Sequence, residues 1–357
     1  MSHPALPAVV LVNLGTPAAP TAKAVRPYLR EFLSDRRVVE THPALWRPIL
    51  ESIILTFRPR ASAAKYATIW GEEGSPLLVH TQSQTRAVAH ALREIAVVRY
   101  AMRYGQPSVR AVMDELYAAG HRRVLVVPLY PQYAASSAGT VLDEAYRWGL
   151  RSRDQVELRT VRSFPIDPGY VEAVAGALQE SWETNGRPDV EHGDKIVLSY
   201  HGIPQAMADA GDPYRSECDA TTAAVARNLG LPAGSILTTF QSTFGPAAWL
   251  KPATIDTVAR LGGEGVRRVD VACPGFVSDC LETLEEIDEL NREAYLEAGG
   301  GEFHYVPWGN GRRCWTDALA NIVAEYLAGW VPANVRESSQ TDHRGVGLTS
   351  LGSANQA

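Results

Sequence analysis

Short apolar runs alternate with segments of helical periodicity along most of the chain. The runs are continuously apolar over four to eight residues, as in KIVLSYH (195–201), whereas the segments between them repeat their apolar residues every three or four positions. Continuous apolar runs are typical of parallel strands that are covered on both faces, and the intervening helices supply the covering layers. The pattern therefore predicts an α/β fold of two doubly wound lobes with parallel sheets.

The same pattern gives the expected order of elements. Strands are expected at 8–15, 97–102, 123–130, 156–162, 195–201, 235–240, 267–273 and 303–307. Helices are expected at 20–34, 42–57, 76–95, 107–119, 138–150, 168–184, 213–229, 252–262, 278–298 and 315–330. We divide the chain into an N-terminal lobe (1–165), a C-terminal lobe (166–312), a helix that packs back on the first lobe (313–331) and a disordered polar tail (332–357).

Composition narrows the class of protein. The net charge of −6 gives no electrostatic reason to expect nucleic acid as a partner. The start of the chain has no basic segment before its apolar run, and no stretch is apolar enough to span a bilayer, so we expect a cytoplasmic protein. The four cysteines show neither a C-x-x-C pair nor the spacing of a zinc site, and no iron–sulfur cluster is expected. Dinucleotide, nucleoside-triphosphate, serine-hydrolase and zinc-protease motifs are absent as well.

Candidate chemistry lies where the expected strands end, because ligands of doubly wound folds bind beyond the carboxyl ends of the strands. His201 ends the strand 195–201 and precedes Gly-Ile-Pro. Imidazole is well suited to take up a proton near neutral pH, but a single histidine at a strand end also commonly has a structural role. Both interpretations stay open at this point.

The stretch CPGFVSDCLETLEEIDEL (273–290) is rich in acids and has no basic residue. On an α-helix beginning near residue 278, five acids would form one line: Asp279, Glu282, Glu286, Glu289 and Glu293. A solvated face of an amphipathic helix is one explanation. The other is a row of carboxylates that serves a divalent cation or carries protons.

The segment PALWRPILESIILTF (43–57) is unusually apolar. It is either a buried helix or a lip that touches a membrane surface, where an apolar substrate would arrive.

Seven ordered segments of the chain are similar to the signature segments of the ferrochelatase family. They are LVNLGTP (11–17), YATIWGEEGSPL (66–77), AMRYGQPSV (101–109), PLYPQYAASSAGT (128–140), SYHGIP (199–204) with GDPY (211–214), FQSTFGPAAWLKP (240–252) and CPGFVSDCLETLEEI (273–287). The wording of the last segment most resembles the protoporphyrin ferrochelatases of Gram-negative bacteria. The resemblance implies two Rossmann-like lobes with a porphyrin cleft between them. It also implies insertion of Fe²⁺ into protoporphyrin IX, the last step of haem biosynthesis, with no cofactor beyond the substrate iron.

The resemblance also implies roles for individual residues. His201 and Glu282 match the catalytic pair that would contact the metal, and Asp279 and Glu286 match a path for protons or metal. Porphyrin-binding positions of the family fall on Leu14, Arg58, Tyr66, Ser75, Arg103, Tyr104 and Tyr133. We expect a monomer that contacts the inner face of a membrane transiently through residues 43–57.

Three positions depart from the usual wording of the family. Thr243 stands where a basic residue is frequent, Ala61 where a lysine is frequent, and Trp308 begins a segment that usually reads Cys-Leu-Asn. These departures leave His201 and Glu282 in place and leave the rim contacts and the substrate preference open. The alternatives are a related chelatase that uses coproporphyrin or Co²⁺, and a non-catalytic tetrapyrrole carrier.

Overall fold

The computed structural model describes residues 5–232, 234–243 and 247–331. Residues 332–357, for which the sequence predicts a disordered tail, lie outside this part of the chain.

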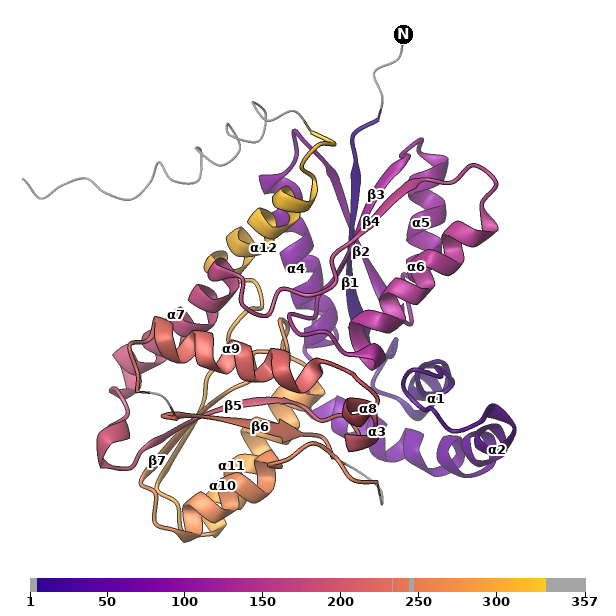
Figure 1. The fold of residues 1–357 in the computed structure, drawn as a ribbon. Helices are drawn as coiled ribbons and strands as arrows, with labels where there is room; N and C mark the ends of the chain where they lie inside the picture. The colour runs from indigo at the N-terminus through magenta and orange to yellow at the C-terminus, as the bar shows by residue number, and fades with distance from the viewer. Residues whose placement is uncertain (1–4, 233, 244–246, 332–357) are drawn as a thin grey trace, which may run out of the picture.

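Two parallel four-stranded sheets form the frame of the molecule (Figure 1). The first has the order β2-β1-β3-β4 and the second β6-β5-β7-β8, so the two sheets repeat one connectivity. The prediction of two doubly wound α/β lobes is thereby confirmed. The strands are β1 Ala8–Gly15, β2 Val97–Tyr104, β3 Arg123–Pro128, β4 Glu157–Thr160, β5 Lys195–His201, β6 Ile236–Gln241, β7 Arg268–Ala272 and β8 Glu302–Tyr305.

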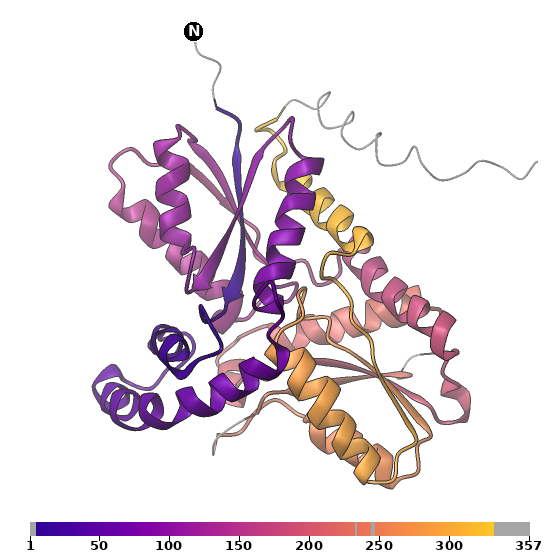
Figure 2. The ribbon, with the colours of Figure 1, turned by 180° about the vertical axis from the view of Figure 1, so that it is seen from behind.

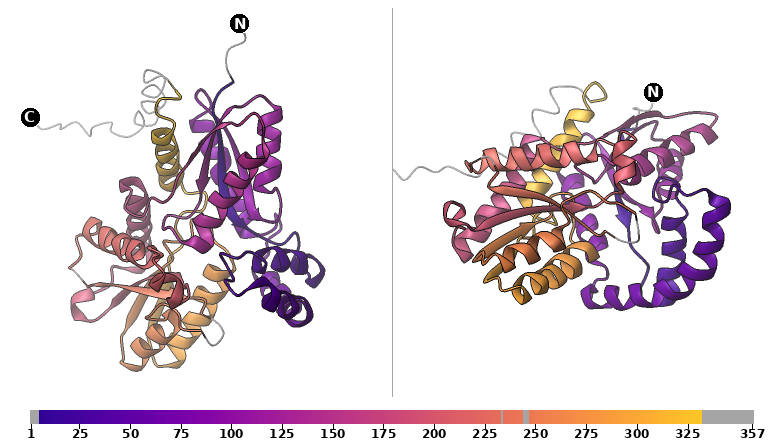
Figure 3. Two further views of the ribbon diagram at one scale, coloured as in Figure 1. Left: turned by 45° about the vertical axis from the view of Figure 1, so that its right-hand side comes forward. Right: turned by 60° about the horizontal axis from the view of Figure 1, so that its bottom comes forward.

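Helices cover both faces of each sheet, as two further views show (Figure 3). Several helices begin at a side chain that satisfies a free backbone amide, as when Asp167 accepts a hydrogen bond from Tyr170 N at 3.0 Å. Around the first sheet lie α4 Pro76–Ala91, α5 Val109–Ala118, the π-helical turn η2 Ala135–Gly139 and α6 Thr140–Arg151. Around the second lie α7 Pro168–Asn185, the 3-10 turn η3 Val190–His192, α8 Gln205–Asp209, α9 Tyr214–Asn228, α10 Thr254–Gly263, the π-helix η4 Glu282–Asn291 and α11 Arg292–Glu297.

A helical arm is inserted between β1 and β2 of the first lobe. It consists of α1 Ala22–Leu33, α2 Pro43–Ile49, the π-helix η1 Leu50–Ile54 and α3 Leu55–Ile69. Seen from behind, the arm lies below the first sheet and α3 runs toward the second lobe, where it contacts η4 (Figure 2). The sequence predicts only one helix at 42–57. The helical segment instead continues to Ile69. The predicted helix ends too early because Pro59 and the small and polar residues that follow hide the apolar periodicity.

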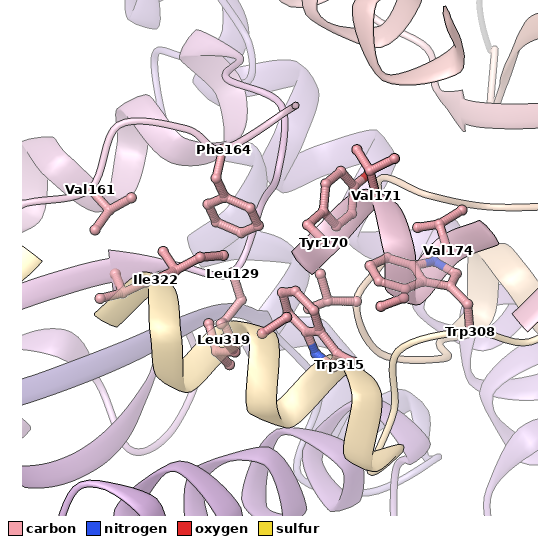
Figure 4. Close-up of a cluster of buried hydrophobic side chains, with 14 of the residues drawn as sticks. Leu129, Val161, Phe164, Tyr170, Val171, Val174, Trp308, Trp315, Leu319 and Ile322 are labelled. Atoms are coloured by element: carbon pink, nitrogen blue, oxygen red, sulfur yellow. The ribbon is translucent and has the colours of Figure 1, made fainter. Parts of the chain in front are cut away.

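The helix α12 Arg313–Tyr326 follows the second lobe in sequence but packs between α7 and α4. Its inner face joins a buried aromatic cluster from both lobes (Figure 4). Trp315 stacks near Phe164 with ring centroids 6.1 Å apart and meets Trp308 at 5.4 Å. This shared core fixes how the two lobes face one another, and hence the geometry of any site between them.

Candidate active site

A cavity lies between the end of β1, the helical arm and the start of η4. Gly15 forms part of its wall, and its backbone has φ +110, where a side chain would be strained. A Cβ at Gly15 would also lie 1.8 Å from the carbonyl oxygen of Tyr104, so the close approach of the neighbouring ends of β1 and β2 requires glycine here. The lining residues are Leu14, Gly15, Thr16, Tyr28, Tyr66, Ser75, Leu77, Cys280, Leu281 and Glu282.

Four predicted residues meet in this cavity, from three distant parts of the sequence: Leu14, Tyr66, Ser75 and Glu282. Ser75 is buried and accepts a hydrogen bond from the Thr16 hydroxyl at 2.9 Å. Tyr66 packs edge-on against Trp70, with ring centroids 6.2 Å apart. Burial raises the pKa of Tyr66, and the nearby Glu282 carboxylate raises it further, so the phenol stays protonated and can donate a hydrogen bond.

Glu282 is placed by the exit of β7. The chain leaves that strand through Cys273-Pro274-Gly275 and turns into a helix only at Leu281, so Glu282 stands in the first turn. Its backbone carbonyl accepts a hydrogen bond from Gln241 Nε2 at 2.6 Å. The residue is half-buried and its side chain contributes to the cavity wall.

His201 ends β5 and lies beside Gln241 in the parallel register of β5 and β6. Its Nδ1 is 2.6 Å from the carbonyl oxygen of Gly202. A carbonyl can only accept, so in the neutral ring Nδ1 carries the proton and Nε2 is left with a free lone pair. The ring of Phe276 lies 6.3 Å away between centroids. His201 does not line the cavity itself, but its register partner Gln241 bonds the backbone of Glu282 and so holds the start of η4 beside the end of β5.

Ser242 follows Gln241 and holds a second acid of the same helix. Both its backbone N–H and its hydroxyl donate to the carboxylate of Glu286. Ser242 has φ +61, the left-handed region that side chains other than glycine seldom adopt, and such strain concentrates at functional sites. The end of β6 is therefore hydrogen-bonded to η4 at two points, the backbone of Glu282 and the side chain of Glu286.

The predicted single line of acids on an α-helix from residue 278 is wrong. Asp279 precedes the helix, and residues 282–291 form a π-helix, whose wider turn breaks the spacing of an α-helical face. Glu289 and Glu293 are exposed. Some acids of this segment also have a basic partner. Lys65 pairs with Glu285 from another part of the chain, and Arg292 pairs with Asp288.

Asp279 is nearly buried, and protein donors engage its carboxylate. Thr283 donates at 2.9 Å and Asn310 at 2.6 Å, and the hydroxyl of Tyr305 donates as well. The backbone N–H of Asp279 in turn donates to Asn310 Oδ1 at 2.8 Å. These bonds tie the start of the acidic segment to the chain that follows β8.

The remaining predicted porphyrin positions lie around the end of the first sheet. Arg103 is buried, pairs with Asp35 and donates to Thr140 O at 3.0 Å. Tyr104 is fully buried and donates to Asp35 at 3.1 Å. Tyr133 is half-buried, with the guanidinium of Arg162 4.3 Å above its ring. Arg58 lies on the exposed side of α3.

Other residues in or near the cavity are not among the predicted site residues. Tyr28 of α1 lines the cavity and donates to Gly15 O at 3.3 Å. Cys280 lines it beside Glu282, and burial raises the pKa of its thiol. Tyr130, at the exit of β3, has a buried hydroxyl with no hydrogen-bond partner among the described residues. The apolar periodicity around Tyr28 marks only a helix, whereas Tyr130 stands at a strand exit, where ligands of doubly wound folds are expected to bind.

Among residues 5–232, 234–243 and 247–331, no group of three or more His, Cys, Asp or Glu side chains is arranged to hold a metal ion. Within the same ranges, no helix has the length and apolar character needed to cross a bilayer.

Comparisons with known proteins agree on one family. The ferrochelatase family model matches residues 7–327. The chain is 51% identical over 326 residues to the ferrochelatase of Methylibium petroleiphilum, covering 90% of this chain and 88% of the relative. It is 51% identical over 327 residues to that of an Azoarcus strain (91% and 89% covered) and 49% identical over 336 residues to that of Chromobacterium violaceum (93% and 91% covered).

Solved structures support the fold. SirB from Bacillus subtilis with Fe³⁺ superimposes with a TM-score of 0.56 at 14% identity, covering 91% of this chain and 97% of that one. DR2241 from Deinococcus radiodurans, described as similar to chelatases, gives 0.53 at 11% identity, covering 95% and 60%.

Proposed function

The chain belongs to the ferrochelatase family, and from this premise we propose how its residues insert Fe²⁺ into protoporphyrin IX to form protohaem. The reaction replaces two pyrrole N–H protons of the porphyrin by one Fe²⁺ ion, so the site must accept two protons and strip water from the metal. The observation that carries the proposal is that Gln241, paired with His201 in the sheet, donates to the backbone carbonyl of Glu282 and so holds the start of η4 beside the end of β5.

His201 acts as the proton acceptor in this proposal. Its Nδ1–H is held by the Gly202 carbonyl, which orients the ring and leaves the Nε2 lone pair available. The Nε2 lone pair can therefore receive a pyrrole proton by general base catalysis.

Glu282 contributes a metal ligand and a second proton acceptor. Its carboxylate supplies the oxygen ligands that a divalent metal accepts, and it can take the second pyrrole proton once the metal has moved on. We treat His201 and Glu282 as one catalytic and metal-contacting pair. Glu286, held by Ser242 farther along η4, continues the acidic side of the site as a path for protons or metal.

Asp279 belongs to that path in the prediction from the family. Because Thr283, Tyr305 and Asn310 all donate to its carboxylate, we propose that it acts by its charge and by fixing the start of η4. A change at Asp279 should therefore affect the position of Glu282 before it affects proton transfer.

The cavity residues hold the macrocycle. Leu14 offers an apolar wall, while Tyr66 and Ser75 offer hydroxyl groups that suit the carboxylates of the porphyrin. Arg58 supplies positive charge on the same arm, and Arg103, Tyr104 and Tyr133 close the side formed by the first sheet. We propose that no cofactor and no iron–sulfur cluster takes part, that the substrate iron is the metal of the site, and that the protein is a cytoplasmic monomer.

The helical arm is the proposed contact with a membrane surface. Leu45, Ile49, Ile53 and Phe57 follow one another at intervals of four residues, with 67%, 41%, 53% and 71% of their surfaces exposed. Leu50 and Leu55, on the other side, are buried. An exposed apolar stripe on a helix inserts into the headgroup region of a bilayer, and α3 of the same arm carries the cavity residue Tyr66.

Vesicle sedimentation tests this contact. Leu45→Ser/Phe57→Ser should reduce binding to vesicles of phosphatidylcholine and phosphatidylglycerol while retaining turnover of detergent-dispersed porphyrin. Tyr146→Ser/Leu150→Ser is the matched control, because those side chains are equally exposed but lie on α6. Equal binding by both variants would contradict a role for the arm.

The catalytic proposal is tested with anaerobic protein, Fe²⁺ and protoporphyrin IX, following the absorbance change from porphyrin to metalloporphyrin. The wild type should turn over and His201→Ala should bind porphyrin without turnover. Parallel reactions with Co²⁺ and with coproporphyrin decide between related chelatases. Tight porphyrin binding by the wild type, with no turnover of any metal, would establish a carrier instead.

A further inference from the structure

One ion pair joins the helical arm of the first lobe to the helix that carries Glu282. Lys65 Nζ lies 2.7 Å from Glu285 Oε1. Lys65 precedes the cavity residue Tyr66 on α3, and Glu285 follows Glu282 by three positions on η4. The pair therefore connects the two walls of the cavity immediately beside the residues that face into it.

The two charges have unequal surroundings. The side chain of Glu285 is 12% exposed, whereas that of Lys65 is 50% exposed. The carboxylate is thus largely withdrawn from water, and Lys65 is the cation beside it. A charge pair of this kind is more strongly oriented than a fully solvated one, because less water competes for the carboxylate.

The opposite side of η4 is held independently. Ser242 binds Glu286, the next residue in sequence, and Gln241 binds the backbone of Glu282. The π-helix is therefore fixed to the second sheet by one set of contacts and to the arm by Lys65. Without the Lys65 contact, the bonds from Gln241 and Ser242 would still hold Glu282 relative to His201, but those bonds would not hold it relative to Tyr66.

We propose that Lys65 and Glu285 are positioning residues of the reaction: their ion pair sets the Glu282 carboxylate opposite the arm wall that holds the porphyrin. This inference rests on the proposed function. It adds a requirement that the catalytic pair alone does not make, namely that the two lobes be joined by charge at this point. A displacement of Glu282 by even about 1 Å is expected to slow the reaction markedly.

A double-mutant cycle tests the proposal, with kcat and KM for porphyrin measured anaerobically at low and high NaCl concentration. Lys65→Met and Glu285→Gln should each lower kcat by about threefold to tenfold with little change in KM, and the double variant should be no slower than either single one. The reversed pair Lys65→Glu/Glu285→Lys should recover part of kcat. High salt should slow the wild type toward the variants and leave the variants unchanged.

Glu264→Gln is the matched control, because it breaks the exposed Arg260–Glu264 pair of 2.8 Å at the end of α10, and neither residue lines the cavity. Its kcat should equal that of the wild type. Wild-type kcat in both single variants, or effects that simply add in the double variant, would overturn the proposal. An inactive wild type would instead refute the proposed function, so the two failures are distinguishable. The salt dependence of the wild-type kcat can be measured without any variant.

Discussion

The two sheets share one strand order, but their carboxyl ends are used differently. At the end of the first sheet, Arg103 and Tyr104 are buried and their polar atoms bind Asp35 and the backbone of Thr140. At the end of the second sheet, His201 is half-buried and its Nε2 has no hydrogen-bond partner among the described residues. One end is closed by internal pairing, and the other leaves a reactive group available.

The difference follows from what is inserted after each first strand. Between β1 and β2 the chain adds the whole helical arm, which covers its strand ends and forms the cavity wall. Between β5 and β6 it adds only α9 and the five-residue α8, so the strand ends meet η4 directly. The same frame thus provides a holding side and a chemical side, and function depends on the insertions more than on the sheets.

The largest expected effect separates chemistry from stability on the second side. Glu282→Gln should lower kcat by about 100-fold to 10,000-fold, because the amide neither takes a proton nor offers a charged ligand. Porphyrin binding, measured by fluorescence quenching, and the urea midpoint should stay near wild type. Glu289→Gln, an exposed acid on the same helix, is the control and should remain active. Undiminished turnover in Glu282→Gln would place the chemistry elsewhere.

The next effect should appear as lost stability on the first side. Arg103→Met leaves the carboxylate of Asp35, 9% exposed, without its buried cation. We expect unfolding in urea to show a loss of about 3 kcal/mol, and Arg103→Met/Asp35→Leu should regain part of it. An unchanged free energy of unfolding would mean that Arg103 serves substrate alone and that the two sheet ends are more alike than their contacts indicate.

A smaller effect should distinguish strain from bonding at Ser242. Ser242→Gly relieves the positive φ but removes the hydroxyl that donates to Glu286. We expect a small gain in melting temperature together with a fall in kcat of about tenfold, the cost of one hydrogen bond to a charged group. Ser242→Ala keeps the strain and should lose kcat without that gain. If both variants keep wild-type kcat, the contact with Glu286 is structural.

The smallest effect should be a pH dependence on the first side. The hydrogen bond and charge of Arg37 hold the pKa of Asp143 below its usual value. A depressed carboxyl pKa stabilises the fold above the unfolded value, about 3.9, and that stability is lost as pH falls through the folded pKa. Asp143→Asn should therefore be less stable than wild type by about 0.5 kcal/mol at pH 7, since the pair is partly exposed. Urea unfolding should show this gap closing toward pH 3, and a constant gap would contradict the linkage.

Apolar runs were sufficient to locate the strands. The prediction for β5 matches the structure at both ends because a continuous buried run has no competing pattern. The acidic helix was misplaced because its spacing was counted with an α-helical period, and nothing in the sequence marks a π-helix. The predicted helix 42–57 ended too early for a similar reason, since α3 has little apolar periodicity beyond residue 57.

The candidate site was recognised mainly through family resemblance. Strand ends alone pointed to His201, and acidic spacing pointed to Glu282, but neither feature could show that Gln241 connects them. The contacts of Lys65 with Glu285 and of Ser242 with Glu286 join residues far apart in sequence. Such pairs depend on how the lobes pack, and no local pattern of residue types encodes that.

The position of α12 has a consequence for biosynthesis on the ribosome. Both sheets are complete in the nascent chain before α12 emerges, yet the aromatic core between the lobes needs Trp315 from that helix. Lobes generally fold in the order in which they are synthesised. The two lobes should therefore reach their final arrangement late in translation, and the cavity between the arm and η4 should be completed only then.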